Sequence, residues 1–414
     1  MKKRVVITGL GVISPVGNDV ASFWQSLKDG KSGVGQITSF DASAFDSRIA
    51  AEVKNFDPTQ YGISLKDVKR TAKFVQFAVA AAKQAVESSG LDLDKEDRNR
   101  IGVIIGSGIG SLHTIEEEHK IYLTKGPSRL SPFLIPMLIV NEASGLVAII
   151  HGLKGPNSCV ATACASGSHA IGEAFRTILY GDADVMVTGG TESCIVPTSV
   201  GGFCALRALS TTNDNPQKAS RPFDRDRNGF VMAEGCGLVV LESLEHAQKR
   251  NAHIIAEIVG FGMTCDAYHI TAPDPDGDGA ARAMTNAMKD AQMDPSGIDY
   301  INAHGTSTKL NDKIETLSMK KAFGESVKKV MVSSIKSMTG HLLGAAGGVE
   351  FLTCCLVIRD GVVPPTINYE HPDPDCDLDY VPNTARKAHV SACMSNSLGF
   401  GGHNASLIVK KFTG

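Results

Sequence analysis

Two cysteines, Cys159 and Cys164, stand out in the stretch SCVATACASGSHAIGEAF, because a cysteine thiolate is a strong nucleophile toward a carbonyl carbon. The small residues Ala163, Ala165 and Gly167 surround Cys164 and would let a substrate carbonyl approach its sulfur. Both cysteines could equally be core residues, since free cysteines are among the most buried residues. The local structure around each cysteine decides which of them could react.

The segment SCVATA is short, apolar and β-prone, which predicts a buried strand that contains Cys159. Apolar residues then recur at helical spacing as far as Gly181, and Ser166 or Ser168 would cap the start of this helix. Cys164 would lie at the helix N-terminus, where unpaired N–H groups and the helix dipole favour thiolate over thiol. We therefore expect the pKa of Cys164 to lie below the ordinary value of roughly 8.5, and Cys159 to stay a neutral thiol.

Three polar residues in the second half of the chain lie near the ends of predicted strands. His304 ends the strand IDYINAHGT, and Lys336 ends the strand VMVSSIKS. His341 follows and opens a helix whose GAAGG stretch permits close backbone packing. In α/β sheets, ligands gather at the carboxyl ends of strands. A histidine there can simply cap a turn and a lysine is usually exposed, but together with Cys164 these residues indicate a site.

The chain alternates predicted strands and helices in an order that occurs twice, which is typical of a duplicated α/β fold. The helix FVQFAVAAAKQAVESSG leads to the strand RIGVIIGSG, and GAARAMTNAMKDAQM leads to IDYINAHGT. We place the boundary between residues 1–252, which carry the nucleophile, and residues 253–414, which carry the histidines and the lysine. A pseudo-twofold axis between these halves would bring the four residues together. An insertion over about residues 111–150 is a candidate interface.

A glycine-rich segment, NSLGFGGHN, lies near the C-terminus. Gly399, Gly401 and Gly402 allow unusual backbone angles and a close approach of substrate, and they leave Phe400 free to swing. The backbone N–H groups of Cys164 and Phe400 could form an oxyanion hole for a thioester carbonyl. By itself the segment could also be a plain glycine turn.

Composition excludes several classes of function. The chain has 414 residues, 43% of them hydrophobic, and a net charge of −3, so nothing predicts binding to nucleic acid or to a membrane. Ten cysteines without CxxC spacing favour a reducing cytoplasm. The basic, apolar start resembles a signal peptide, but Gly9, Gly11 and Pro15 break it, so we expect a first strand there.

Known cofactor motifs are incomplete. The glycine-rich segments GLGVIS and GSGIGSL have Ser14 and Ser111 where a dinucleotide fingerprint needs its third glycine. The segment HTIEEEHK lacks the spacing of metal ligands and is most simply a solvated helix face. These segments therefore predict neither a dinucleotide site nor a metal site.

Four motifs occur in order: GPNSCVATACASGSHAIGEAF, NAHGTSTKLNDKIE, SSIKSMTGHLLGAAGGVE and SNSLGFGGHN. Together they resemble the β-ketoacyl-[acyl-carrier-protein] synthases, in particular the elongating type II enzymes of bacterial fatty acid synthesis. The resemblance runs from RVVITGLGVISPVGN to ASLIVKK. It implies a thiolase fold, an α/β fold with duplicated βαβαβαββ halves in a five-layered αβαβα arrangement, and a homodimer. The implied reaction joins acyl-carrier and malonyl-carrier proteins, with loss of CO2, into 3-oxoacyl-carrier protein through an acyl-cysteine.

The resemblance also implies roles for individual residues. Cys164 matches the nucleophile, His304 and His341 match the pair that assists decarboxylation and stabilises the enolate, and Lys336 matches the lysine that tunes that site. The remaining matches are the acid expected to hold the lysine, Glu315; hydroxyls for the phosphopantetheine arm, Thr306 and Thr308; further substrate-binding positions, Ile109, Phe203, Gly399 and Gly401; and the gate, Phe400. Basic candidates for docking the acidic carrier protein are Lys66, Lys69, Arg70, Arg129 and Arg207. No cofactor is implied, because the carrier protein brings the phosphopantetheine.

Departures from the family pattern leave chain-length preference open. Leu398 stands where many members have a second phenylalanine, and KLN follows HGTST where PAG is commoner. Ile109 favours the type II class, because type I relatives usually have glycine there.

Several alternatives stay open. A biosynthetic thiolase would use a late second cysteine, and Cys393 is misplaced for that role; a starter-type synthase pairs its cysteine with His and Asn. A polyketide condensing enzyme shares the same residues. A non-catalytic partner subunit would lack the nucleophile that Cys164 supplies, and a cysteine hydrolase would need an activated water.

Overall fold

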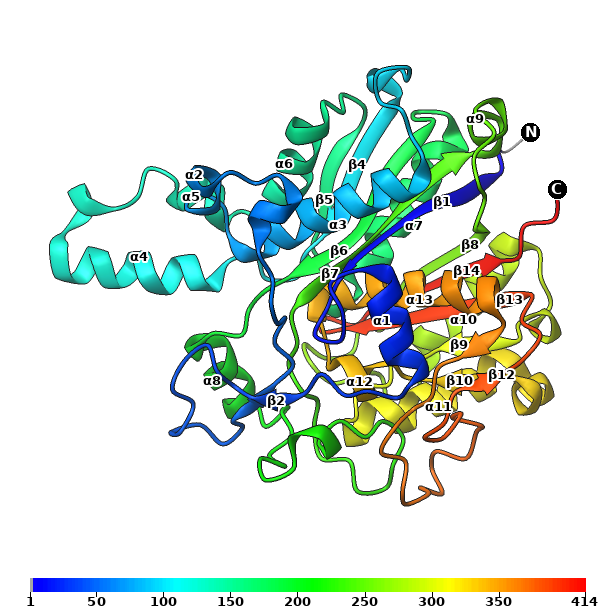
Figure 1. Ribbon diagram of the computed structural model, residues 1–414. Helices are drawn as coiled ribbons and strands as arrows, with labels where there is room; N and C mark the ends of the chain where they lie inside the picture. The colour runs from blue at the N-terminus through cyan, green and yellow to red at the C-terminus, as the bar shows by residue number, and fades with distance from the viewer. Residues whose placement is uncertain (1–2) are drawn as a thin grey trace.

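A ten-stranded mixed sheet forms the framework of the computed structural model, which describes residues 3–414 (Figure 1). The strand order is β10-β9-β13-β14-β8-β1-β7-β6-β4-β5. The strands are β1 (Val5–Ile13), β4 (Ile101–Gly106), β5 (Asn157–Val160), β6 (Val185–Glu192), β7 (Gly235–Ser243), β8 (Ala256–Cys265), β9 (Tyr300–Asn302), β10 (Met331–Ser333), β13 (Ala392–Gly399) and β14 (His403–Lys410). Two small antiparallel pairs are β2 (Gly35–Gln36) with β3 (Ile49–Ala50), and β11 (Val362–Val363) with β12 (Arg386–Lys387).

The strand order confirms the duplication. Numbered along the chain within each half, both sets of five strands run third, second, fourth, fifth, first: β5-β4-β6-β7-β1 and β10-β9-β13-β14-β8. A short antiparallel ladder joins the halves, where residues 5–7 of β1 pair with residues 256–258 of β8. The boundary expected after residue 252 lies between α9 and β8 and stays a prediction.

Helices lie in three layers around the strands (Figure 1). Helices α3 and α6 cover the outer face of the first half, α10 covers the outer face of the second with α11 packed against it, and α7 and α13 pack between the two sets of strands. The helices are α1 (Val20–Lys28), α2 (Leu65–Val68), α3 (Lys73–Ser89), α4 (Leu112–Lys125), α5 (Leu134–Leu138), α6 (Glu142–His151), α7 (Ser166–Tyr180), α8 (Pro197–Ala205), α9 (Leu244–Lys249), α10 (Asp278–Ala291), α11 (Lys309–Phe323), α12 (Lys336–Thr339) and α13 (Ala346–Asp360). The arrangement is therefore the predicted five-layered αβαβα fold.

The central layer depends on glycines that let α7 and α13 approach each other. A Cβ added to Gly167 of α7 would lie 2.8 Å from the backbone nitrogen of Gly348 in α13. A Cβ on Gly348 would lie 2.2 Å from the carbonyl oxygen of Gly237 in β7. Real Cβ atoms do not come this close, so the GAAGG segment is needed for the close backbone packing that its sequence predicts.

The insertion after β4 carries α4 and α5 away from the body of the molecule (Figure 1). Large apolar side chains on this arm lie open to solvent, among them Leu123, which is 69% exposed, and Ile135, which is 60% exposed. Strand β5 is the neighbouring edge of the sheet. In the described part of the chain, no helix is both long and apolar enough to cross a membrane.

Candidate active site

Cys164 lies in a tight turn between β5 and α7. The strand ends at Val160, sooner than SCVATA predicts, and a short 3-10 turn over Ala163–Ala165 leads into the helix. Ala163 has a positive φ of 50°, an uncommon conformation for a residue with a side chain. The strain is held locally, because the Thr162 N–H donates to Ser166 Oγ at 2.9 Å and the Ser166 hydroxyl donates to the Ala163 carbonyl at 2.7 Å.

The predicted cap of this helix is wrong. Ala165 occupies the N-cap position, and no side chain caps the helix start. Ser166 is already inside the helix and bonds back to the turn, while Ser168 pairs with the hydroxyl of Ser397 at 2.8 Å. The first-turn N–H groups are therefore not taken up by a serine cap.

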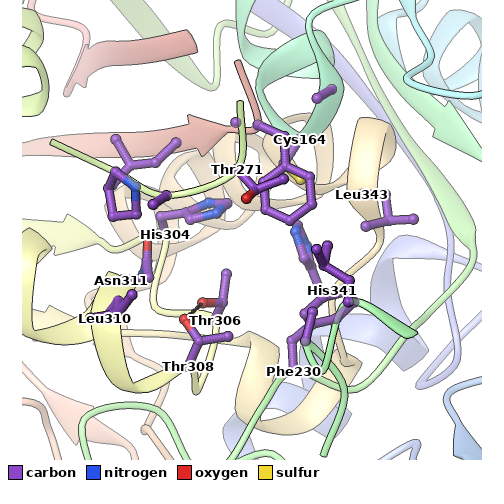
Figure 2. A pocket seen from close by; sticks show the side chains of 18 of the residues that line it. Cys164, Phe230, Thr271, His304, Thr306, Thr308, Leu310, Asn311, His341 and Leu343 are labelled. Carbon is purple, nitrogen blue, oxygen red and sulfur yellow. Dashed lines mark hydrogen bonds between the residues drawn. The ribbon is translucent and has the colours of Figure 1, made fainter. Parts of the chain in front are cut away.

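Cys164 lines a cavity of about 500 Å³ together with both predicted histidines, His304 and His341 (Figure 2). These residues come from the two halves of the fold, after β5, β9 and β10 respectively. Further residues of the cavity wall are Ile109, Phe203, Thr306, Thr308, Gly399 and Phe400, all of them predicted, and Phe230, Leu343 and Leu398. Cys159 does not line the cavity; its sulfur contacts the Val140 carbonyl at 3.4 Å.

Burial, not the helix N-terminus, dominates the acidity of the two cysteines. It raises the pKa of Cys164 to about 12, although the charge of Lys336 and the Phe400 N–H act in the opposite direction. The expected low pKa of Cys164 is thus wrong for the free site, because this residue is only 9% exposed to water. Burial also raises the pKa of Cys159 to about 11, as expected for a neutral thiol.

His304 and His341 face each other edge to face, with ring centroids 5.3 Å apart. Burial first, and then the positive charge of Lys336, hold the pKa of both imidazoles well below the ordinary 6.5. The backbone of His341 is fixed by the first half of the chain, since its N–H donates to Val231 at 2.7 Å and its carbonyl accepts from Ala233 at 2.9 Å. Because their pKa values are held low, both rings are neutral. Nδ1 of His341 has no hydrogen-bond partner within the described chain.

Lys336 lies behind the histidines and does not line the cavity. It begins α12, three residues beyond the end of β10, and is 1% exposed. Its ammonium group donates to the His304 carbonyl at 2.6 Å, lies 3.5 Å from His304 Nδ1, and forms a short ion pair with Glu350. The lysine therefore acts on His304 from the side away from the cavity.

The acid predicted to hold Lys336 is the wrong one. Glu315 accepts the backbone N–H groups of His304 and Gly305, both at 2.7 Å, and burial raises its pKa to about 7. Glu350 of α13 holds the lysine instead. A buried lysine needs an acid beside it, but the sequence contains no signal that favours Glu350 over Glu315.

The hairpin between β13 and β14 brings Phe400 against Cys164. A Cβ added to Gly399 would lie 2.8 Å from the Thr162 carbonyl and 3.3 Å from the Cys164 nitrogen, so the strand end packs on the turn through its backbone. The Phe400 N–H then faces the Cys164 sulfur. Gly401, with φ of 87°, makes the turn of the hairpin but does not line the cavity.

Other predicted positions differ in how near they lie to this cavity. The hydroxyls of Thr306 and Thr308 are 3.0 Å apart and both line it. Arg207 is exposed and lies at the cavity wall, whereas the other four basic candidates are exposed and do not line it: Lys66, Lys69, Arg70 and Arg129. Their docking role stays a prediction.

Comparisons with known proteins cover nearly the whole chain. The model of the beta-ketoacyl synthase N-terminal domain matches residues 2–247, and that of the C-terminal domain matches residues 255–370. The chain is 55% identical to 3-oxoacyl-[acyl-carrier-protein] synthase 2 of Coxiella burnetii, over 99% of each chain. It is 54% identical to the protein of the same name from Synechocystis, again over 99% of each. A solved ketosynthase in complex with its type II polyketide acyl-carrier protein is 38% identical, with a TM-score of 0.93 over 100% of both chains.

Proposed function

Since the chain belongs to the β-ketoacyl synthase family, we propose that it elongates fatty acids by condensing acyl-[acyl-carrier protein] with malonyl-[acyl-carrier protein]. The observation that carries this proposal is the meeting of Cys164, His304 and His341 around one cavity. The products are 3-oxoacyl-[acyl-carrier protein], CO2 and free carrier protein.

The first half-reaction loads the acyl chain onto Cys164. The sulfur attacks the thioester carbonyl, its proton goes to the departing carrier thiol, and a new thioester forms on the enzyme. The packing of Gly399 on the turn at Cys164 supports an oxyanion hole in which the N–H groups of Cys164 and Phe400 stabilise the negative oxygen of the tetrahedral intermediate. Burial favours the thiol form of Cys164, so the sulfur must lose this proton in the course of the reaction.

The second half-reaction generates the carbon nucleophile at the histidine pair. Neutral imidazoles can donate hydrogen bonds to the thioester oxygen of the malonyl group, and this oxygen becomes an enolate when CO2 leaves. The enolate carbon then attacks the acyl-Cys164 carbonyl and releases the sulfur as a thiolate, which takes up a proton from water to restore the thiol. The charge of Lys336 opposes protonation of His304 and His341, so both stay neutral as this step requires.

The carrier protein is the proposed partner, and a second copy of the chain is another. A solved relative was captured with its own acyl-carrier protein. Strand β5 is an open sheet edge beside the apolar arm, which suits symmetric pairing with a second copy. All ten cysteines are free, which supports a reducing cytoplasm. No resident cofactor is proposed, since loss of CO2 itself supplies the carbanion.

The relatives favour fatty acid over polyketide synthesis. Identity to the 3-oxoacyl synthases is 54–55%, against 38% to the polyketide ketosynthase. The presence of Cys164 argues against a non-catalytic subunit.

Intact-protein mass spectrometry tests the proposal. The enzyme is mixed with an acyl-carrier thioester and then chased with malonyl-carrier protein. An adduct on Cys164 that disappears as 3-oxoacyl-carrier forms is the expected result. Release of the adduct as free acid would instead indicate a hydrolase, and no adduct at any chain length would indicate a non-catalytic subunit.

A further inference from the structure

Glu192, the last residue of β6, is a fully buried carboxylate for which the reaction above has no role. Its Oε2 accepts the N–H groups of Gly108 at 2.8 Å and Gly344 at 3.1 Å. Its Oε1 accepts the Ser107 hydroxyl at 3.0 Å and the Ile109 N–H at 3.3 Å. All four donors are neutral, so the carboxylate binds backbone and hydroxyl groups and forms no ion pair with residues 3–414.

These donors belong to two cavity segments from different halves of the fold. Gly108 and Ile109 follow β4 and form cavity wall, and Gly344 follows His341 and Leu343, which line the cavity as well. The segments touch, since a Cβ on Gly344 would lie 2.3 Å from the Gly108 nitrogen. Without the carboxylate, N–H groups from both halves would converge in a dry core with no acceptor.

The second half has a comparable carboxylate behind its corresponding strand, although this one comes from helix α11 and not from a strand. Glu315 accepts the two peptide N–H groups that follow β9, those of His304 and Gly305. Strand β4 of the first half has the position that β9 has in the second. Glu315 thus fixes the backbone of a catalytic histidine after β9, and Glu192 fixes the backbone of Ile109 after β4.

We propose that Glu192 is a positioning residue for acyl-chain specificity: it holds Ile109, a wall of the cavity beside Cys164, against the segment that follows His341. This inference rests on the proposed function, because it concerns the acyl chain carried by Cys164. Ile109 packs in the apolar cluster that also contains Cys164 and Phe203, so a shift of its backbone changes the space open to the chain.

The variant Glu192→Gln removes one of the four contacts selectively. The amide oxygen can replace Oε2 and keep the N–H groups of Gly108 and Gly344. The amide NH2 then lies at the Oε1 position, where it can donate to the Ser107 hydroxyl. It cannot accept the Ile109 N–H, so two donors face each other and this hydrogen bond is lost. We expect Ile109 to be held less firmly at the cavity wall. The ratio of kcat/KM for long acyl-carrier substrates to kcat/KM for short ones should then rise by about fivefold or more.

Glu234→Gln is the matched control. Glu234 is 2% exposed and accepts the Val53 N–H, the Ser193 hydroxyl and the Lys73 ammonium group, none of which lines the cavity. It should change stability and leave the chain-length ratio as in the wild type. An equal change of ratio in both variants, or no change in a folded Glu192→Gln protein, would overturn the proposal.

Two further measurements distinguish an effect of Glu192 on the position of Ile109 from a general loss of stability. In an Ile109→Ala background, the effect of Glu192→Gln on the ratio should vanish, whereas an additive effect contradicts action through Ile109. In the unmodified enzyme, hydrogen exchange should find the Ile109 amide strongly protected, and free exchange would refute the proposal whether or not the variants fold. A wild type that never acylates Cys164 would instead refute the proposed function itself.

Discussion

Adding one methyl group at Gly399 should separate the two halves of the oxyanion hole. The new Cβ would lie 2.8 Å from the Thr162 carbonyl oxygen, 3.2 Å from the Ala165 nitrogen and 3.3 Å from the Cys164 nitrogen, and ordinary contact begins at 3.4 Å. The hairpin must therefore retreat by roughly 0.6 Å, which exceeds the roughly 0.5 Å within which catalytic groups must be held. Since Phe400 is the next residue, its N–H retreats with the strand end.

The expected loss of acylation rate follows from how much one oxyanion-hole N–H group contributes to that rate. Removal of such a donor costs about 10²–10³ in rate, so Gly399→Ala should acylate Cys164 about 100-fold more slowly than the wild type. Rapid-quench mass spectrometry of the acyl-enzyme measures this rate, and a thermal melt establishes that the variant is folded. Gly35→Ala is the control, because a Cβ at Gly35 meets no atom within 4 Å. A folded Gly399→Ala protein that acylates within threefold of the wild-type rate would refute the assignment of this hairpin.

Further predictions concern the other residues of the site. Cys164→Ala should abolish acyl-enzyme formation and Cys159→Ala should retain most of it, as read by intact mass; equal loss in both would contradict the choice of nucleophile. His304→Ala should slow CO2 release from malonyl-carrier protein by about 100-fold while Cys164 still acylates, and normal CO2 release would remove the histidine from the enolate site. The pKa of His304 is held well below 6.5, so protonation of this ring should not slow CO2 release in the wild type as pH falls from about 7.5 to about 6, whereas an ordinary histidine would give a roughly fourfold drop with its midpoint near pH 6.5. Glu350→Gln leaves the Lys336 cation buried without its anion and should lower the free energy of unfolding by about 3–5 kcal/mol in chemical denaturation, whereas a loss under 1 kcal/mol would mean that the pair is not buried.

Local pattern was sufficient for the regular elements, because their signals lie within a few residues. The helix FVQFAVAAAKQAVESSG matches α3 to within one residue at each end, the strand RIGVIIGSG contains β4, and the helix GAARAMTNAMKDAQM matches α10 except for its last two residues. The repeated order of these elements predicted the duplication, which the strand order confirms. The strand around Cys159 ended sooner than predicted because the chain must bend to present Cys164, and the strained φ of Ala163 makes that bend.

The sequence by itself determined which residue types gather at the site. Cys164, His304 and His341 each follow a strand, and strands of one sheet bring their ends together, so their meeting could be expected from the order of elements. The resemblance of four ordered motifs added the reaction. The resemblance also predicted a role for Lys336, but it did not predict that this lysine lies behind the histidines.

Only the tertiary structure decided the pKa values at the site and which buried groups pair with one another. The pKa of Cys164 depends on how much water is excluded around its sulfur, and burial there outweighs the helix N-terminus that the sequence made visible. The choice of Glu350 over Glu315 as the anion beside Lys336 depends on which of two buried carboxylates lies within reach after α11 and α13 have packed. Glu192 had no signal in its neighbourhood, because its four donors come from segments more than 80 residues away in the chain. Contacts of this kind are set by packing between segments that are far apart in the chain, and spacing along the chain contains no record of them.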